Sequence, residues 1–266
     1  MSYRQRVYRT QVVILRRRDF SDADRILTVF TPRMGKKEFI ARGIRKTASR
    51  KAGHLELFTH SSLMVALGRT WDVVTEASTV ESFRHLRAGL DEIGQASYLA
   101  ELVDRFTEVD NENEPVWDLL LIALRELDAH ALQPDFDARL LLRWFELHLL
   151  SVTGFQPQFF HCLNCDKPLE PVTNYISMQA GGVLCPECAG VAPDAEPIEA
   201  DVLKVLRHLQ RNMWDDLRGL KVRPSLMHQV DSLLYRYLLS ILERRLKSVD
   251  FLRRLQSLGS AGGPQS

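Results

Sequence analysis

The chain has 266 residues, of which 45% are hydrophobic and 26% charged; this composition excludes wholesale disorder and is ordinary for a globular protein. The formal net charge is only +1, but residues 1–80 carry sixteen Lys and Arg against seven Asp and Glu, and the rest of the chain carries a net charge of −8. A basic segment joined to an acidic one predicts a polyanion-binding surface on the first and a different role for the second.

Uninterrupted apolar stretches are short throughout the chain. The longest, Leu119–Leu124, has six residues, whereas a membrane-spanning helix needs about 20. Near the start, Val12–Leu15 is too short for the apolar region of a signal peptide. We therefore expect a cytoplasmic protein without a membrane partner.

The first eighty residues have the β-branched, alternating pattern of short strands separated by turn residues. The predicted strands are Gln11–Leu15, Arg25–Phe30, Lys36–Ala41, Ser61–Leu67 and Trp71–Ala77. Five short strands suit a small closed barrel such as the OB-fold, and an SH3-like barrel fits the count nearly as well.

After residue 80 the apolar period changes to the 3.6 residues of a helix. Amphipathic stripes occur at 98–106, 116–127, 138–150, 202–209 and 230–241. The fold class is therefore α+β and multidomain: an N-terminal barrel (1–80) and a helical domain (81–156 and 198–258). A Pro-, Gly- and Cys-rich insertion (157–197) interrupts the helical domain, and the Gly- and Ser-rich tail (259–266) is expected to be disordered.

Four cysteines form two C-x2-C pairs, Cys162 with Cys165 and Cys185 with Cys188, nineteen residues apart. Two thiolates from each of two tight turns complete the tetrahedron that Zn²⁺ accepts, as in a zinc ribbon. Four thiolates leave no open coordination position, so we expect one structural Zn²⁺ per chain. Two disulfides, four unrelated thiols, or His161 in place of one thiolate are the weaker alternatives.

Residues 42–51 hold five cations and no carboxylate, which is typical of a loop that contacts phosphates without reading sequence. Two further basic groups lie nearby in the chain. The candidate DNA-binding residues are Arg16, Arg17, Lys36, Lys37, Arg42, Arg45, Lys46, Arg50 and Lys51. Five aromatic residues could stack on bases, although most rings of so small a barrel must fill its core: Tyr8, Phe20, Phe30, Phe39 and Trp71.

No catalytic motif is present: there is no phosphate-binding G-x-x-x-x-G-K-[ST], no G-x-S-x-G and no H-E-x-x-H. Asp22 and Asp24 precede a strand, where turn capping explains them more simply than Mg²⁺ binding. We therefore do not expect an enzyme. A nuclease that uses Asp22, Asp24 and Glu38 is the least favoured of three functional hypotheses.

Five features follow one another in a specific order: Asp19–Thr31, Ala41–Lys46, Gly53–Phe58, Ser97–Leu102 and the two cysteine pairs. In this order they resemble the RecO family of bacterial recombination mediators. The resemblance runs from about residue 10 to 190 and more loosely to 255. The Arg16–Arg18 cluster and the Lys36–Glu38 turn have no match in it, so their expected DNA role depends on charge alone.

The resemblance implies an OB-type barrel, a helical domain and a zinc-binding insertion. It also implies a nucleoid-associated protein that binds single- and double-stranded DNA, anneals complementary strands without ATP and partners RecR. Such proteins help to load RecA onto strands covered by single-strand-binding protein. An RNA-binding or ribosome-associated zinc-ribbon protein is the alternative, favoured only if the basic loop prefers RNA.

The helical domain offers a candidate groove for the acidic, apolar tail of single-strand-binding protein. Arg139 and Arg143 edge an otherwise apolar helix, and Arg244 and Arg245 edge a later one. Packed side by side, these two helices would flank an apolar slot with cations that read carboxylates. The simpler alternative is that Arg139 and Arg143 only pair with nearby carboxylates at the surface.

Overall fold

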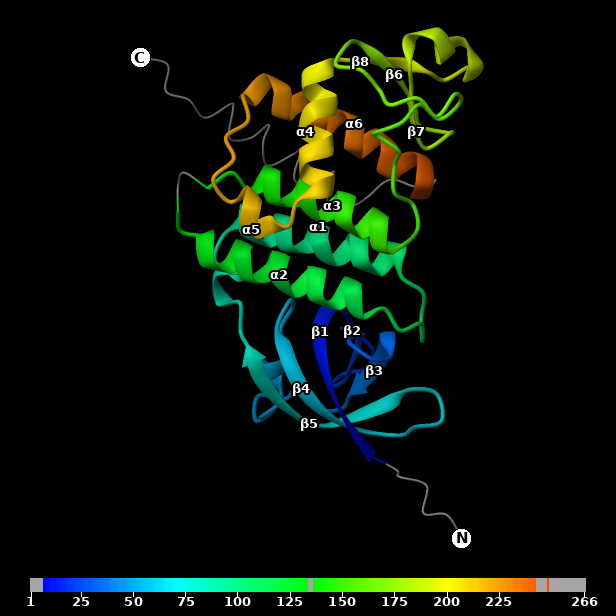
Figure 1. Ribbon diagram of the computed structural model, residues 1–266. Helices are drawn as coiled ribbons and strands as arrows, with labels where there is room; N and C mark the ends of the chain where they lie inside the picture. Colours follow the sequence, from blue (N-terminus) through cyan, green and yellow to red (C-terminus); the bar gives the residue numbers. More distant parts are fainter. Residues whose placement is uncertain (1–6, 134–135, 243–247, 249–266) are drawn as a thin grey trace. The chain divides into compact units, whose positions relative to one another are not determined.

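A computed structural model describes residues 7–133, 136–242 and 248 (Figure 1). The chain divides into two compact units. One contains the described residues of Met1–Phe136 and of Lys247–Ser266, and the other contains those of Asp137–Leu246. Among the described helices, none combines the length and the apolar character needed to cross a lipid bilayer.

The first unit begins with five strands wrapped into a barrel (Figure 1). They are β1 (Val7–Asp19), β2 (Arg25–Thr31), β3 (Gly35–Ala41), β4 (His60–Ala66) and β5 (Asp72–Glu81). The strand order is β1-β2-β3-β5-β4, and β4 pairs back with β1. The parallel β3–β5 contact is the shortest, with two residue pairs.

The long first strand explains how the ring closes. Residues Val7–Val13 of β1 pair with β4, and Val13–Asp19 pair with β2, with a register shift between Ile14 and Arg16. A bulge of this kind bends a strand and increases its twist, so one strand serves two neighbours in a closed barrel. This strand order confirms the OB-type barrel and excludes the SH3-like alternative.

Alternating side chains of the strands fill the interior of the barrel. The core includes Val12 and Ile14 of β1, Leu27 and Val29 of β2, and Phe39 of β3. Each of these side chains is at most 1% exposed. The period of two in the sequence therefore marks the inward face of each strand.

Two helices complete the first unit. Helix α1 (Leu90–Phe106) packs against β1. Helix α2 (Glu114–His130) is preceded by Asn113, whose side chain caps the helix by accepting from the backbone N–H of Val116. Arg125 of α2 forms two hydrogen bonds, of 2.8 and 2.9 Å, with the carboxylate of Glu81 on β5. These bonds hold the pKa of Glu81 below its usual range.

The second unit is a group of helices with a small sheet. Helices α3 (Ala138–Val152), α4 (Ala200–Arg211) and α6 (Pro224–Leu242) contact one another, and α5 (Trp214–Leu217) is a single turn. Strands β6 (Asn174–Ser177), β7 (Gly182–Leu184) and β8 (Glu196–Ile198) form an antiparallel sheet in the order β7-β6-β8. This sheet lies between α3 and α4 and coincides with the predicted insertion, except that β8 ends one residue beyond it.

The elements expected from the sequence are confirmed: each helical stripe and three of the strands lie within an observed element, and the predicted strands Ser61–Leu67 and Trp71–Ala77 each extend one residue beyond β4 and β5. The predicted domain boundaries at 80, 156 and 197 stay a prediction, and the observed division places α1 and α2 in the same unit as the barrel. The tail 259–266 lies outside the described residues.

The turn before β3 requires a glycine. Gly35 has φ +59°, and a Cβ atom built there would overlap the backbone carbonyl of Asn111 in the segment between α1 and α2. The amide of Asp110 donates to the carbonyl oxygen of Lys36 at 3.0 Å in the same place. The α1–α2 connection therefore contacts β3 directly, with no room for a side chain at position 35.

We predict that Gly35→Ala lowers the free energy of unfolding, because the left-handed backbone alone costs an L-residue about 1–2 kcal/mol and the overlap with Asn111 adds to this. Gly53→Ala is the matched control: nothing lies within 4 Å of its added methyl group and its φ is not positive, so a change within about 0.5 kcal/mol is expected. Urea denaturation of both variants measures the difference. Equal stability of the two would contradict the close approach.

Candidate functional site

The basic loop, residues 42–51, is held against the turn between β1 and β2. The backbone N–H of Gly43 donates to the carboxylate of Asp24 at 2.8 Å, and the N–H of Arg45 donates to the carbonyl oxygen of Ala23 at 3.0 Å. The Arg45 guanidinium also donates to the carbonyl oxygen of Ser21 at 3.1 Å. These three bonds fix the first half of the loop to the barrel.

Three cations of the loop are exposed and have no charged partner among the residues that the structure describes: Arg42, Lys46 and Arg50. Arg45 differs, because its guanidinium lies 3.5 Å from the Asp19 carboxylate in addition to its bond to Ser21. Arg45 thus helps to position the loop, while the other three present uncompensated positive charge to solvent.

The two lysines of β3 are already neutralised. Lys36 is buried, with its ammonium 3.1 Å from the carboxylate of Asp104 on α1, and Lys37 pairs with Asp110 at 2.5 Å. Both carboxylates lie about seventy residues further along the chain, so no local sequence pattern predicts these two ion pairs. The predicted DNA-binding role of these lysines stays a prediction with weaker support than that of the loop.

The remaining three candidate DNA-binding residues differ in how exposed their side chains are and in which groups they contact. The side chain of Arg16 is 58% exposed and 3.9 Å from Asp104. Arg17 is 2.8 Å from the Glu56 carboxylate, and its side chain is only 19% exposed. Lys51 donates to the carbonyl oxygen of Val74 at 2.8 Å, and burial lowers the pKa of its ammonium. Arg16 is therefore the most exposed of the three, although its guanidinium also donates to the Thr28 hydroxyl at 3.4 Å.

The three acidic residues considered for a nuclease do not form a metal cluster. Within the described part of the chain, the only group of three or more His, Cys, Asp or Glu side chains close enough to hold an ion is the four cysteines. Asp24 instead accepts from the loop, and Glu38 lies 3.8 Å from Arg18. Asp24 thus has a positioning role that the sequence analysis missed.

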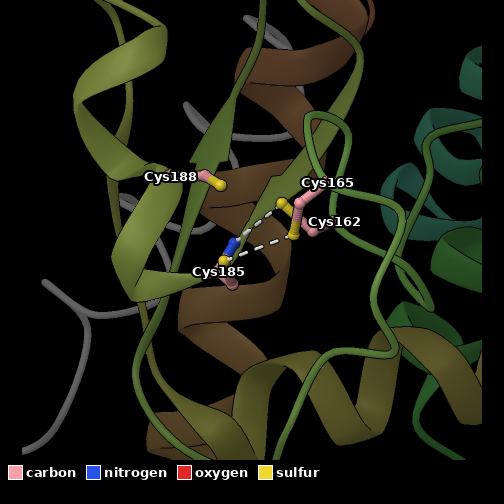
Figure 2. A group of neighbouring side chains, drawn as sticks. All are labelled: Cys162, Cys165, Cys185 and Cys188. Carbon is pink, nitrogen blue, oxygen red and sulfur yellow. Dashed lines mark hydrogen bonds between the residues drawn. The ribbon is translucent and has the colours of Figure 1, made fainter.

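The two cysteine pairs come together in the second unit, and their sulfur atoms face a common space (Figure 2). All four thiols are free, and their Sγ atoms lie within 4.8 Å of one another. The Sγ atoms of Cys165 and Cys185 are 3.9 Å apart. A tetrahedral site with metal–sulfur bonds of about 2.3 Å has sulfur atoms roughly 3.8 Å apart, so the cluster could hold a metal ion.

Hydrogen bonds to Sγ of Cys162 favour its thiolate form. Burial raises the pKa of the Cys162 thiol, but backbone N–H groups, including that of Cys185 at 3.3 Å, outweigh burial and lower this pKa to about 6. The side-chain amide of Asn164 donates to Sγ of Cys188 at 3.3 Å. The exposed His161 is not a member of the cluster.

The arginines of α3 are occupied by carboxylates of their own unit. Arg139 binds the Asp137 carboxylate through two N–H groups, at 2.9 and 2.7 Å. Arg143 is buried and pairs with Glu146 at 2.5 Å and with Asp231 of α6 at 3.5 Å. The other edge of the predicted groove, Arg244 and Arg245, lies outside the described residues, so the groove stays a prediction.

Comparison with known proteins places the two parts of the chain in one family. Residues 1–83 match the family "Recombination protein O N terminal", and residues 87–250 match "Recombination protein O C terminal". A "DNA repair protein RecO" of Roseiflexus sp. (strain RS-1) is 43% identical over 263 residues, covering 99% of this chain and 91% of the relative.

Other relatives are similar over nearly their whole length. The "DNA repair protein RecO" of Dehalococcoides mccartyi (strain ATCC BAA-2266 / KCTC 15142 / 195) is 34% identical, with 93% of this chain and 96% of the relative covered. That of Symbiobacterium thermophilum is also 34% identical, with coverage of 94% and 98%. The match covers almost the entire chain, including the barrel, the helices and the cysteine cluster. The chain therefore belongs to the recombination protein O (RecO) family.

Proposed function

We propose that this protein is a DNA-binding recombination mediator that anneals complementary strands and, with RecR, helps to load RecA onto DNA covered by single-strand-binding protein. The observation that carries the proposal is the basic loop on the OB-type barrel, with Arg42, Lys46 and Arg50 exposed and without carboxylate partners in the described structure. Family membership supports a role in recombinational DNA repair.

The mechanism is physical rather than chemical. Two complementary strands repel each other, and cations that bind their phosphates lower this repulsion by releasing condensed counterions. Backbone contacts carry no base information, so they leave the base edges free to pair. The bonds that Gly43 and Arg45 make to the β1–β2 turn keep the cations on the barrel surface while the strands meet.

Neither alternative function gains support. The comparisons point to DNA repair proteins rather than to ribosomal or RNA-binding ones. For a nuclease, Asp24 would have to release its bond to the Gly43 amide before it could bind a metal.

The DNA-binding proposal predicts that Arg42→Glu with Lys46→Glu weakens DNA binding and annealing uniformly across sequences. The slope of log affinity against log salt becomes shallower, by up to about 1.8 on duplex and about 1.4 on single strands if both residues contact phosphates. Both side chains are exposed, so the fold is expected to persist. Binding isotherms at several salt concentrations measure the slope.

Lys204→Glu with Lys221→Glu is the matched control, since it makes the same change in net charge at two exposed positions of the second unit. If the loop variant loses more DNA affinity than the control variant, the loss is assigned to the loop. The same affinity and slope for wild type and the loop variant would mean that the loop cations are only solvated.

We also propose that the cysteine cluster holds one structural Zn²⁺. Two tight turns bring the thiols together, with the Cys188 N–H donating to the carbonyl oxygen of Cys185 at 3.0 Å and the Asp166 N–H donating to that of Cys162 at 3.0 Å. Four sulfur ligands with N–H donors around them suit a closed site. When bound, the ion would link the two turns and supply no catalytic chemistry.

Cys185→Ser is predicted to abolish stoichiometric zinc binding and to loosen the insertion while the barrel stays folded, because structural zinc contributes about 10–16 kcal/mol of apparent binding energy at neutral pH. Thr173→Ser, an exposed position in the same insertion, is the control. Elemental analysis and limited proteolysis provide the measurements. Wild-type protein that contains no metal when purified without chelator would contradict this proposal.

The protein partners are proposed as RecR and the acidic tail of single-strand-binding protein. The proposal for RecR rests on family membership alone. For the tail, Arg139 is the better candidate of the two described arginines, since its side chain is 43% exposed, whereas the Arg143 side chain is 11% exposed and bound by two carboxylates.

If Arg139 receives the tail, Arg139→Ala weakens binding of a fluorescent tail peptide measured by anisotropy, and Arg139→Lys retains most of it. Arg143→Ala is a poor test, because it breaks the buried ion pair with Glu146, and removing one partner of a buried pair destabilises a protein by about 3–5 kcal/mol. Unchanged affinity in Arg139→Ala would place the docking site elsewhere.

A further inference from the structure

Most aromatic rings of the barrel are unavailable to a ligand. Phe30, Phe39, Phe58 and Phe83 are each at most 5% exposed, and Tyr8, which is partly exposed, packs its ring against the barrel core and donates its hydroxyl hydrogen to the Asp72 carboxylate at 2.7 Å. Two rings differ among the residues described: Phe20 is 48% exposed, and Trp71 is partly exposed beside it.

Phe20 and Trp71 come from different turns and meet at the barrel surface. Phe20 follows β1 in the β1–β2 turn, and Trp71 ends the β4–β5 turn. Their ring centroids are 5.0 Å apart with an interplanar angle of 72°. In OB-type barrels these are the two turns that commonly contact oligonucleotides.

Both turns are fixed by hydrogen bonds, so the rings are positioned before any ligand arrives. The N–H of Phe20 donates to the carbonyl oxygen of Asp24 at 3.1 Å, and the N–H of Gly68 donates to the Asp72 carboxylate at 3.0 Å. A Cβ atom at Gly68 would overlap the carbonyl oxygen of Trp71. This preorganisation lowers the entropic cost of stacking a base.

Three cations lie near the pair, and two of them, Arg18 and Arg45, also have carboxylate partners. The Arg18 guanidinium carbon lies 5.9 Å from the centroid of the Trp71 ring, and Arg69 is exposed in the same turn as Trp71. On the Phe20 side, Arg45 of the basic loop donates to the carbonyl oxygen of Ser21, the next residue in the chain. Aromatic faces beside cations are the combination that binds single-stranded nucleic acid.

We propose that Phe20 and Trp71 form a stacking platform for an unpaired base, which gives the barrel a preference for single-stranded over duplex nucleic acid. This inference rests on the proposed function and identifies the form of DNA that the barrel favours. The faces of paired bases are covered by their neighbours in the duplex, whereas every unpaired base offers a face. A base held by its face keeps its edge free for a complementary strand.

The test compares three ligands of equal length: an oligothymidine, an abasic strand with the same phosphates, and a duplex. Wild type is expected to bind the oligothymidine more tightly than the abasic strand. Phe20→Ala should weaken oligothymidine binding by roughly 5- to 150-fold, the range for loss of one stacked base, with little change for the other two ligands. Phe20→Tyr keeps the ring and should restore the preference.

Tryptophan fluorescence gives an independent readout. Trp117, Trp144 and Trp214 are each at most 5% exposed, so a change in emission on adding oligothymidine should come from Trp71. Trp71→Phe should remove this change while retaining most of the affinity, because a ring remains. The abasic strand should leave the emission of wild type unchanged.

Three outcomes would overturn the stacking platform: equal binding of oligothymidine and abasic strand by wild type, no loss in Phe20→Ala, or a parallel loss for all three ligands. In each of these cases the basic loop would still bind phosphates, and the proposed function would stand. Wild type that binds none of the three ligands would instead overturn the proposed function itself, and the platform with it.

Discussion

The carboxylate of Asp24 links the two parts of the barrel on which the proposed function depends. It accepts a hydrogen bond from the backbone of Gly43, where the basic loop leaves β3. Two residues on, Arg45 continues this contact through its own backbone and side chain. A segment with so many like charges would otherwise extend away from the barrel, since its cations repel one another. One half-buried acceptor therefore helps to determine where the positive charge of the loop is presented.

Much of the architecture follows from local sequence pattern. The period of two gave the strands and the period of 3.6 gave the helices, because burial on one face is the same physical demand in any fold. The spacing of Cys162, Cys165, Cys185 and Cys188 likewise specifies a cluster, since each pair needs only one tight turn. The choice between OB and SH3-like barrels was different, because it depends on which strands pair, and the β3–β5 contact leaves no signature in either strand.

Charge was the least reliable guide to the site. Counting Lys and Arg in the first eighty residues treats every cation as available, but Lys36 and Lys37 are bound by Asp104 and Asp110 from the helical part of the same unit. Similarly, Arg143 of the apolar helix α3 is paired with Asp231, which lies almost ninety residues away. Ion pairs between distant segments have no local pattern, so the cations that stay free can be identified only in the folded chain.

The pairing of β3 with the α1–α2 connection bears on how far the barrel is a separable module. The family match divides the chain near residue 83, yet the buried ammonium of Lys36 has its counter-ion on α1, and the imidazole of His60 packs on the indole of Trp117 in α2. A fragment cut at this division would leave a buried cation without a carboxylate and an aromatic surface open to water. Transfer of the barrel alone to another protein during evolution would leave the same groups without their partners. The smallest segment that could be transferred with these contacts intact therefore includes α1 and α2.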